Sequence, residues 1–229
     1  KKPTGALILD DGNIFKGYGC GYEGSVIGEV CFNTAMTGYQ EIMTDPSYAS
    51  QIITFTFPHI GNVGTNFEDV ESEKGPKIKG AIFNSPITSP SNWRSKKNLN
   101  QWLIDNKITA LYGVDTRSIT AHIREKGFMN GIIVNDQNGF KESKSYKNKL
   151  SKWEGIVGQD LAKNVSTKEI YNWTEREESF LSDKIQSINK HIVIIDYGVK
   201  NNILRCLASR FNKLTIVPCD TTSEKILSL

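Results

Sequence analysis

The stretch from Phe32 to Asn66, FNTAMTGYQEIMTDPSYASQIITFTFPHIGNVGTN, constrains the fold more than any other part of this chain. It has no regular apolar period until SQIITFTFP, which alternates as a strand and stops at Pro58. Before that strand, Asp45-Pro46-Ser47 predicts a tight turn, because proline presets φ and the Asp and Ser side chains bond to nearby backbone. A polar loop beside a well-formed strand is typical of a binding site on a rigid scaffold.

Composition indicates an ordinary globular protein. The chain has 229 residues, 38% of them apolar, and a formal net charge of +3, which is too small to predict a nucleic-acid or membrane partner. The sequence has neither an apolar run near the roughly 20 residues of a membrane span nor the pattern of a signal peptide. Its cysteines form no CxxC pair, so we expect reduced thiols in a cytoplasmic protein and no metal site: Cys20, Cys31, Cys206 and Cys219.

Residues 1–165 are predicted to form a strand-rich domain of the α+β or mixed α/β class. ALIL and NIFKG flank a turn at residues 10–12 and predict a hairpin. The segments SVIGEVCFN, QIITFTF, KGAIFN and MNGIIV predict further strands. Two helices are expected, one over residues 91–106 with Ser91 as its cap, and one that starts after Asp115 and stops at Gly127.

Residues 166–190 are polar with isolated aromatics, which suits a connector pinned by Tyr171 and Trp173. A second domain is expected over residues 191–229, where HIVIID and KLTIVP predict two parallel strands that open a doubly wound sheet. Its helix is predicted from apolar residues at every fourth position: Val199, Ile203, Leu207 and Phe211. Thr221 and Glu224 predict a capping box for a last helix, in which the chain stops, so we expect a truncated domain.

Five motifs in order resemble the small, glutamine-using subunit of carbamoyl phosphate synthetase. They are the stretch FNTAMTGYQEIMTDPSYASQI with FPHIGNVGTN, then PSNWR, GVDTRSIT, IREKGFMNG and IDYGVKNNILR, and only residues 136–190 match loosely. The resemblance implies an N-terminal small-subunit domain of the swivelling β/β/α type over residues 1–165. After the connector it implies the first βαβ unit of a class I glutamine amidotransferase domain.

The resemblance also implies the reaction of the whole enzyme, in which glutamine, bicarbonate and ATP give carbamoyl phosphate for arginine and pyrimidine synthesis. The small subunit releases ammonia from glutamine, and the large subunit performs the ATP chemistry. The expected partners are therefore the large subunit, in a heterodimer, and L-glutamine. No cofactor is expected in this chain, because ATP and magnesium belong to the large subunit.

Ser47 is the one site residue that the resemblance transfers to this sequence, as a contact to bound glutamine. A hydroxyl on a tight turn can bond the polar end of an amino acid, whereas the residues alone indicate only that Ser47 completes the turn. The family hydrolyses glutamine with a cysteine on a strand-to-helix elbow, activated by a histidine. These 229 residues contain no G-x-C-x-G elbow, so no catalytic residue is predicted and we expect this chain to be inactive. Cys206 and Cys219 are interpreted as structural.

Two other functions remain open at this point. One is a non-catalytic module that only binds the large subunit, with the charged face of Asp115, Arg117, Arg124 and Glu125 as a candidate docking surface. The ordinary interpretation of that face is helix capping and pairing in solvent. The other is a different amidotransferase, which IDYGVKNNILR permits and TGYQEIMTDPSY opposes.

Overall fold

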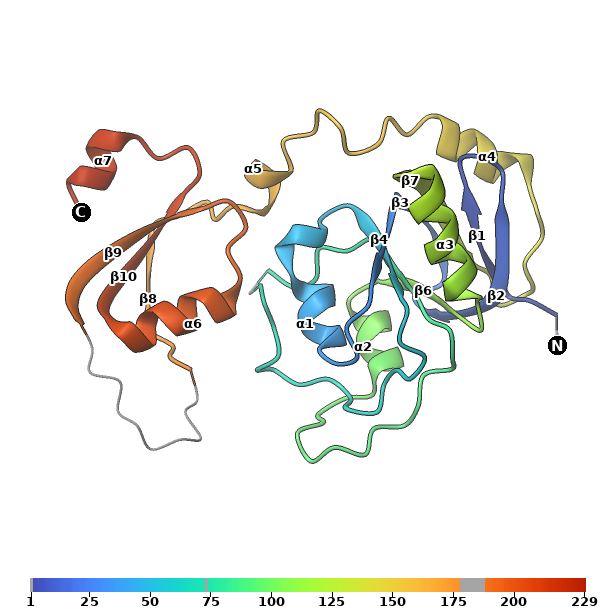
Figure 1. Ribbon diagram of the computed structural model, residues 1–229, viewed down its shortest axis with the longest axis horizontal. Helices are drawn as coiled ribbons and strands as arrows, with labels where there is room; N and C mark the ends of the chain where they lie inside the picture. The colour runs from blue at the N-terminus through green and yellow to red at the C-terminus, as the bar shows by residue number, and fades with distance from the viewer. Residues whose placement is uncertain (1, 73, 178–187) are drawn as a thin grey trace.

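A computed structural model describes residues 2–72, 74–177 and 188–229, which form two α/β units side by side (Figure 1). The strands of the first unit are β1 (Gly5–Leu9), β2 (Ile14–Gly21), β3 (Gly24–Asn33), β4 (Gln51–Phe55), β5 (Gly80–Ile82), β6 (Thr109–Tyr112) and β7 (Met129–Asn135). They close into a barrel in the order β1-β2-β6-β5-β4-β3-β7. The swivelling β/β/α assignment stays a prediction, whereas the mixed, strand-rich α/β class is observed.

The predicted hairpin is confirmed, since β1 and β2 pair antiparallel. By contrast, the neighbours β3-β4, β4-β5 and β5-β6 are parallel, and β6 itself was not predicted. Parallel neighbours require crossover connections outside the sheet. The polar stretch that follows β3 is such a crossover, and it carries α1 (Tyr39–Thr44) and the 3-10 helix η1 (Pro46–Tyr48).

The other helices of this unit are α2 (Leu99–Asp105), α3 (Thr116–Lys126), α4 (Lys144–Ser151) and α5 (Leu161–Val165). The helix after Asp115 is confirmed, because its carboxylate accepts from the N–H of Ser118 and Gly127 ends the helix. The start predicted at Ser91 is wrong. The N–H of Ser91 donates to the carbonyl of Asn62, and the Asn98 side chain caps α2 instead by accepting from the N–H of Asn100.

Alternating strand residues supply a buried cluster inside the barrel, and α3 contributes to it. Its buried members are Leu7, Leu9, Val30, Ile52, Ile82, Leu111, Val114, Ile119, Ile123, Met129 and Ile133. The residues that point outward from β4, β5 and β6 pack instead against Tyr39 and Met43 of α1 and Leu99 and Leu103 of α2. Helix α1, and with it the Asp45-Pro46-Ser47 turn, is therefore anchored on the barrel wall.

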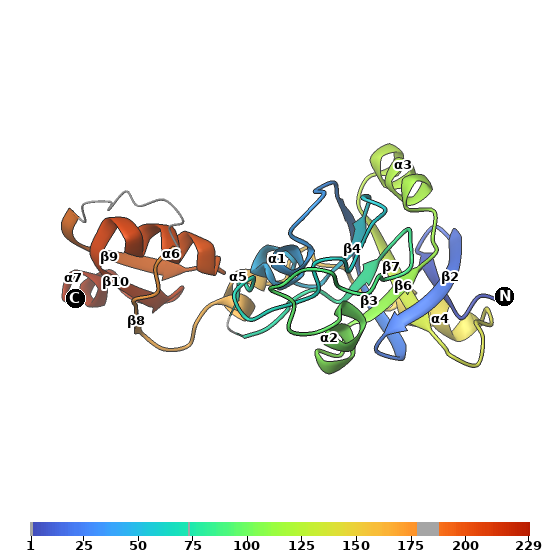
Figure 2. The ribbon, with the colours of Figure 1, turned by 90° about the horizontal axis from the view of Figure 1, so that it is seen from below.

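The second unit contains β8 (Tyr171–Trp173), β9 (Ile188–Asp196), β10 (Phe211–Pro218), α6 (Asn201–Arg210) and α7 (Ser223–Leu227). Strands β9 and β10 are parallel, as predicted, and the sheet order is β8-β10-β9. The domain limits given by the sequence stay predictions. The segment expected to be a connector also supplies β8, which pairs antiparallel with β10. Helix α6 covers one face of this sheet (Figure 2).

Two local predictions for this unit need correction. Helix α6 starts at Asn201, and it buries Leu204 and Ala208, whereas Ile203 is 48% exposed. The cap of α7 is Thr222 rather than Thr221, because the Thr221 hydroxyl donates to the Pro218 carbonyl and closes the preceding turn.

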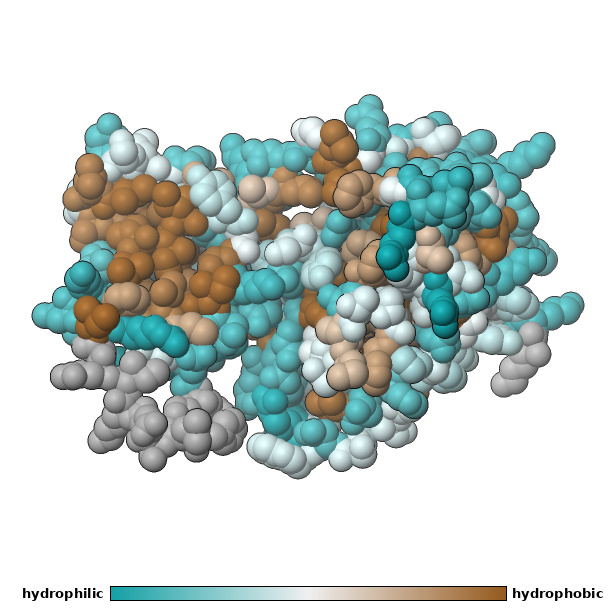
Figure 3. Space-filling model, in the orientation of Figure 1, coloured by the Kyte–Doolittle hydropathy of each residue, from teal (hydrophilic) through white to brown (hydrophobic). Residues whose placement is uncertain are grey.

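The second unit also carries an apolar surface beside β9 and α7 (Figure 3). Ile195 is 39% exposed and Leu227 is 87% exposed. None of the helices in the described part of the chain has the length and apolar character that a bilayer crossing requires.

Candidate functional site

The predicted turn at Ser47 is present, as the 3-10 helix η1. One carboxylate oxygen of Asp45, Oδ1, accepts a hydrogen bond of 2.8 Å from the backbone N–H of Ser47. Pro46 is buried, whereas Ser47 itself is exposed. The turn is therefore fixed from inside the protein, and Ser47 lies at the surface.

An ion pair joins this turn to the second unit. Asp45 is 4% exposed, and its other oxygen, Oδ2, lies 2.7 Å from Nζ of Lys200, the residue before α6. The hydrogen bond to the Asp45 carboxylate raises the pKa of Lys200 above its ordinary value, so the lysine is charged at neutral pH. Sequence reasoning missed Lys200, because nothing local relates it to a residue 155 positions earlier.

The amino end of α6 makes a second link between the units. The N–H of Asn201 donates to the carbonyl of Glu71 at 3.1 Å, and the N–H of Asn202 donates to the Glu71 carboxylate at 2.9 Å. The N–H of Glu71 in turn donates to the Thr44 hydroxyl at 2.9 Å, at the end of α1. A carboxylate at a helix N-terminus satisfies free N–H groups and complements the helix dipole. Glu71 therefore links the end of α1 to the start of α6.

The turn after β9 packs directly against the Ser47 turn. The carboxylate of Asp196 accepts from the N–H groups of Gly198 and Val199 at 2.8 and 2.9 Å, and its other oxygen accepts from the N–H of Thr167. Gly198 has φ of 94°, and a Cβ added there would lie 3.2 Å from the Pro46 Cβ. A glycine is needed at this position both for its φ and for the close approach.

A cavity of about 380 Å³ opens at this junction, at the carboxyl end of β9. In open α/β sheets, ligands bind at the carboxyl ends of the strands. Its lining carries both signs of charge, from Lys74, Lys168, Glu169 and Asp196, beside Pro46 and Gly198 of the two turns. Groups of both signs can orient a small zwitterion, such as an amino acid.

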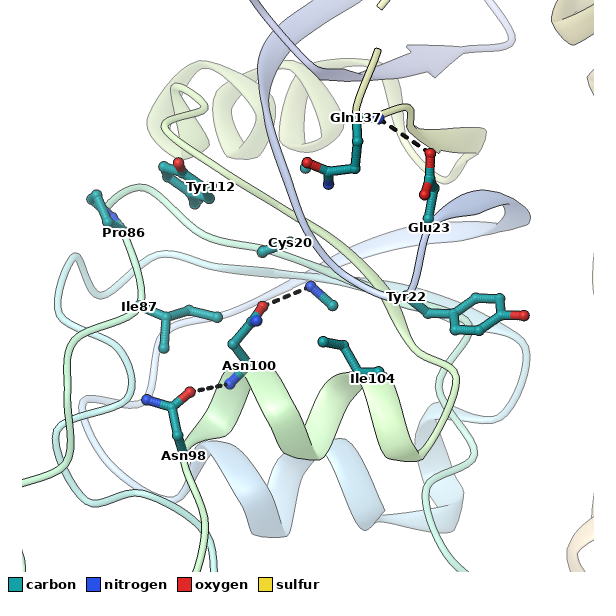
Figure 4. Close-up of a pocket in the computed structure, with 12 residues that line it drawn as sticks. Cys20, Tyr22, Glu23, Pro86, Ile87, Asn98, Asn100, Ile104, Tyr112 and Gln137 are labelled. Atoms are coloured by element: carbon teal, nitrogen blue, oxygen red, sulfur yellow. Dashed lines mark hydrogen bonds between the residues drawn. The ribbon is translucent and has the colours of Figure 1, made fainter. Parts of the chain in front are cut away.

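A second cavity, of about 650 Å³, lies in the first unit between β2 and α2 (Figure 4). The Asn100 side chain accepts from the N–H of Gly21 at 2.8 Å there, and the Glu23 carboxylate accepts from the N–H of Gln137 at 3.3 Å. Ser47 lines neither this cavity nor the one of about 380 Å³, to which its turn contributes Pro46. The described residues also contain no cluster of three or more His, Cys, Asp or Glu side chains that could hold a metal ion.

The thiols of Cys20, Cys31 and Cys206 are poorly suited to nucleophilic attack. Burial raises the pKa of Cys20 and of Cys31 to about 12. Cys206 lies on α6, as expected, and its hydrogen bond to the Glu177 carboxylate at 2.9 Å raises the pKa of its thiol. Because the thiolate is the reactive form, these groups stay protonated near neutral pH.

Comparison with known proteins identifies relatives of this chain. Residues 7–133 match the family model of the carbamoyl-phosphate synthase small chain, CPSase domain. The carbamoyl phosphate synthase small chain of Bartonella quintana (strain Toulouse) is 52% identical over 235 residues, which cover 100% of this chain and 58% of that relative. That of Mesorhizobium japonicum is 48% identical over 237 residues, with 100% and 59% covered. The chain thus spans less than two thirds of the length of these relatives.

Proposed function

Because the chain belongs to the carbamoyl-phosphate synthase small chain family, we propose that it acts in the small subunit of a glutamine-dependent carbamoyl phosphate synthase. This subunit would deliver ammonia from glutamine to a large subunit. The observation that carries the proposal is the Ser47 turn, which Asp45 fixes from the barrel side and Lys200 fixes from the second unit.

Ser47 is proposed as a contact to the amino-acid part of glutamine. Its exposed hydroxyl can donate to a carboxylate or accept from an ammonium group. The turn stands where the two units meet, beside a cavity lined by charges of both signs. A substrate bound here would contact both units, and this gives the links through Glu71 and Lys200 a direct role in binding.

The described residues supply binding rather than bond cleavage. Amide hydrolysis by a thiol needs a thiolate and a base, and the environments of Cys20, Cys31 and Cys206 favour the protonated thiol. We therefore propose that residues 1–229 alone do not hydrolyse glutamine. We further propose that ATP and magnesium are bound by the large subunit. The heterodimer would act in the cytoplasm, and its product would be used in arginine and pyrimidine synthesis.

The test of the Ser47 role is Ser47→Ala in a version of the protein that hydrolyses glutamine. One hydrogen bond contributes about 0.5–1.5 kcal/mol, or up to about 3 kcal/mol to a charged group. The KM for glutamine should therefore rise from a few-fold to about a hundred-fold, while synthesis from added ammonia stays unchanged. Ser25→Ala, at an exposed serine of β3, is the matched control. An unchanged KM with a lower melting temperature would assign Ser47 to the turn alone.

A non-catalytic docking module is the second candidate function, favoured by the protonated thiols. The measurement is glutamate release by homogeneous 229-residue protein and by its Cys206→Ser, Cys219→Ser double variant. We expect both to match the buffer blank. Release that the double variant abolishes would identify a nucleophile among these thiols. Release that it leaves unchanged would show that the chemistry lies elsewhere in the chain.

A further inference from the structure

We propose that the cavity of about 650 Å³ between β2 and α2 binds a neutral, planar, amide-bearing ring of the nucleobase class, free or as an unphosphorylated nucleoside. We call this cavity the amide pocket. Its volume lies within the roughly 300–1,000 Å³ that small-molecule sites occupy. Its walls belong to the first unit alone, so the inference does not depend on the proposed function or on the Ser47 turn.

Two asparagines on the α2 side of the amide pocket are held by their side-chain oxygens. Oδ1 of Asn98, which caps α2, accepts from the N–H of Asn100 at 2.8 Å. Oδ1 of Asn100 accepts from the N–H of Gly21 at 2.8 Å, and this ties α2 to the end of β2. Within the described part of the chain, neither –NH₂ group makes a hydrogen bond. Both asparagines are half-buried, so each supplies a fixed donor that lacks a protein partner.

Gln137 supplies an acceptor on the opposite side of the amide pocket (Figure 4). Its Nε2 donates at 2.9 Å to Asn135, which is 1% exposed. The Asn135 amide in turn donates to the carbonyls of Cys20 and Tyr22, both at 3.1 Å, so Gln137 is anchored to β2. Its own Oε1 makes no hydrogen bond with any described residue. Asparagine and glutamine amides recognise the edges of bases through this combination of donors and acceptors.

Apolar side chains line the rest of the amide pocket, from Ile87, Ile104 and Tyr112. The Tyr112 ring is fixed by stacking on Tyr18, with ring centroids 5.4 Å apart and 28° between the ring planes. Bases stack on aromatic side chains whatever their sequence, because every base has a π face. A planar ligand can therefore add to this stack while its edge meets the amides.

The charges of the lining decide between ligand classes. Among the described residues that line the amide pocket, Glu23 is the only one with a charged side chain, and it is exposed to water. A phosphate or carboxylate buried here would lack a cation to pair with, which is costly. The cavity near Ser47 differs, because it carries Lys74 and Lys168 as well as Asp196. A zwitterion is therefore suited to that cavity, and a neutral ring to the amide pocket.

The experiment measures binding of uridine, adenosine, uracil and adenine to the full chain by calorimetry. We expect a Kd on the order of 0.1–1 mM for the preferred ring, as for other ligands of this size. Asn98→Asp and Asn100→Asp should each weaken binding about 5-fold or more, because each keeps the oxygen that holds the wall and removes the –NH₂ donor. Equal binding of a base and its nucleoside would identify the base as the ligand, and tighter binding of the nucleoside would identify the nucleoside.

Asn92→Asp is the matched control. Asn92 is exposed and lies outside the amide pocket, and its side-chain oxygen accepts from the N–H of Arg94 at 2.8 Å in the same way. The variant should bind like the wild type. Circular dichroism should show all three variants folded, because an aspartate accepts the same N–H bonds.

Four results would overturn the inference. The wild type could fail to bind any of the four compounds at millimolar concentration, or Asn98→Asp and Asn100→Asp could leave binding unchanged. The 5′-phosphates could bind more tightly than the nucleosides, which would indicate a cationic site elsewhere. Displacement by glutamine or by agmatine, a small organic cation, would assign binding to the cavity near Ser47 or to Glu23. None of these results except displacement by glutamine bears on the proposed function.

Discussion

Replacing Lys200 by methionine tests the link between the two units. Methionine keeps most of the apolar stem of the lysine and removes its charge. The change leaves the Asp45 carboxylate, which is buried, without the cation that lies 2.7 Å away. The other Asp45 oxygen still accepts from the N–H of Ser47, so the turn can form but is held from one side only.

The magnitude follows from the exposure of the two side chains. The Lys200 side chain is 43% exposed and that of Asp45 is 6% exposed. Exposed pairs contribute about 0.2–1 kcal/mol, whereas removing one partner of a fully buried pair costs about 3–5 kcal/mol. Because Lys200 is partly exposed and Asp45 is buried, we expect Lys200→Met to lower the free energy of unfolding by ~1–2 kcal/mol, between these two cases. For a chain of this size that lowers the melting temperature by about 2–8 °C.

The assay is thermal unfolding of the wild type, Lys200→Met, Asp45→Asn and the double variant. The coupling energy of the cycle should be on the order of 1 kcal/mol, as for residues in contact. Lys97→Met, which breaks the more exposed pair with Asp105, is the control and should lower the melting temperature less than Lys200→Met does. Under the proposed function, Lys200→Met should also raise the KM for glutamine.

The pH dependence has a defined sign. The hydrogen bond to Asp45 raises the pKa of Lys200 in the folded chain above that of a free lysine, near 10.4. The stability from this pair is therefore fully present below about pH 10.4, and it disappears as the pH rises through the folded pKa. The gap between wild type and Lys200→Met should be constant from about pH 6 to 9 and close in stronger alkali. A melting temperature equal to wild type, with no coupling in the cycle, would refute the idea that this pair holds the turn.

Three further predictions concern the packing of each unit. Gly19→Ala should cost about 1–3 kcal/mol in unfolding experiments, because its Cβ would lie 1.7 Å from the Asn135 amide oxygen and force that side chain to move; an unchanged stability would contradict the barrel packing. Cys20 and Cys31, with pKa values raised to about 12 by burial, should resist a thiol reagent at pH 8 until the protein unfolds. Amide exchange should be faster in the edge strand β9 than in β4, which has hydrogen-bonded neighbours on both sides, and equal protection would contradict this.

Local patterns in the sequence were enough to predict many elements of the fold. The hairpin of β1 and β2, the strand β4 and the helix capped by Asp115 each follow from alternation, turn residues or a cap within a few positions. Strand β6 has only four residues, and β8 has three, so neither offers a period long enough to recognise. Barrel closure was also missed, because it depends on pairing between distant strands.

At the candidate site, too, the features set by neighbouring residues could be predicted, whereas contacts between residues far apart in the sequence could not. The turn around Ser47 was predicted from Asp45 and Pro46, because an Asp-Pro pair determines its own local geometry. The contacts of Glu71 with α6 and of Lys200 with Asp45 were not predicted, because they form only after both units have folded. The available signal was a lysine and two asparagines at the start of a helix. These residue types do not indicate which distant residues they will contact.

The closed barrel also dictates when the first unit can finish folding during synthesis. Strand β1 pairs on one side with β2, and on the other with β7, where Gly5 is opposite Asn135. A ribosome adds roughly 5–20 residues per second, so β1 waits on the order of 10 s for that second neighbour. Until then the nascent chain exposes the edges of β1 and β3, both of which β7 later covers. We therefore expect chaperones that shield strand edges to meet this chain early, and release as the IREKGFMNGIIV segment leaves the exit tunnel.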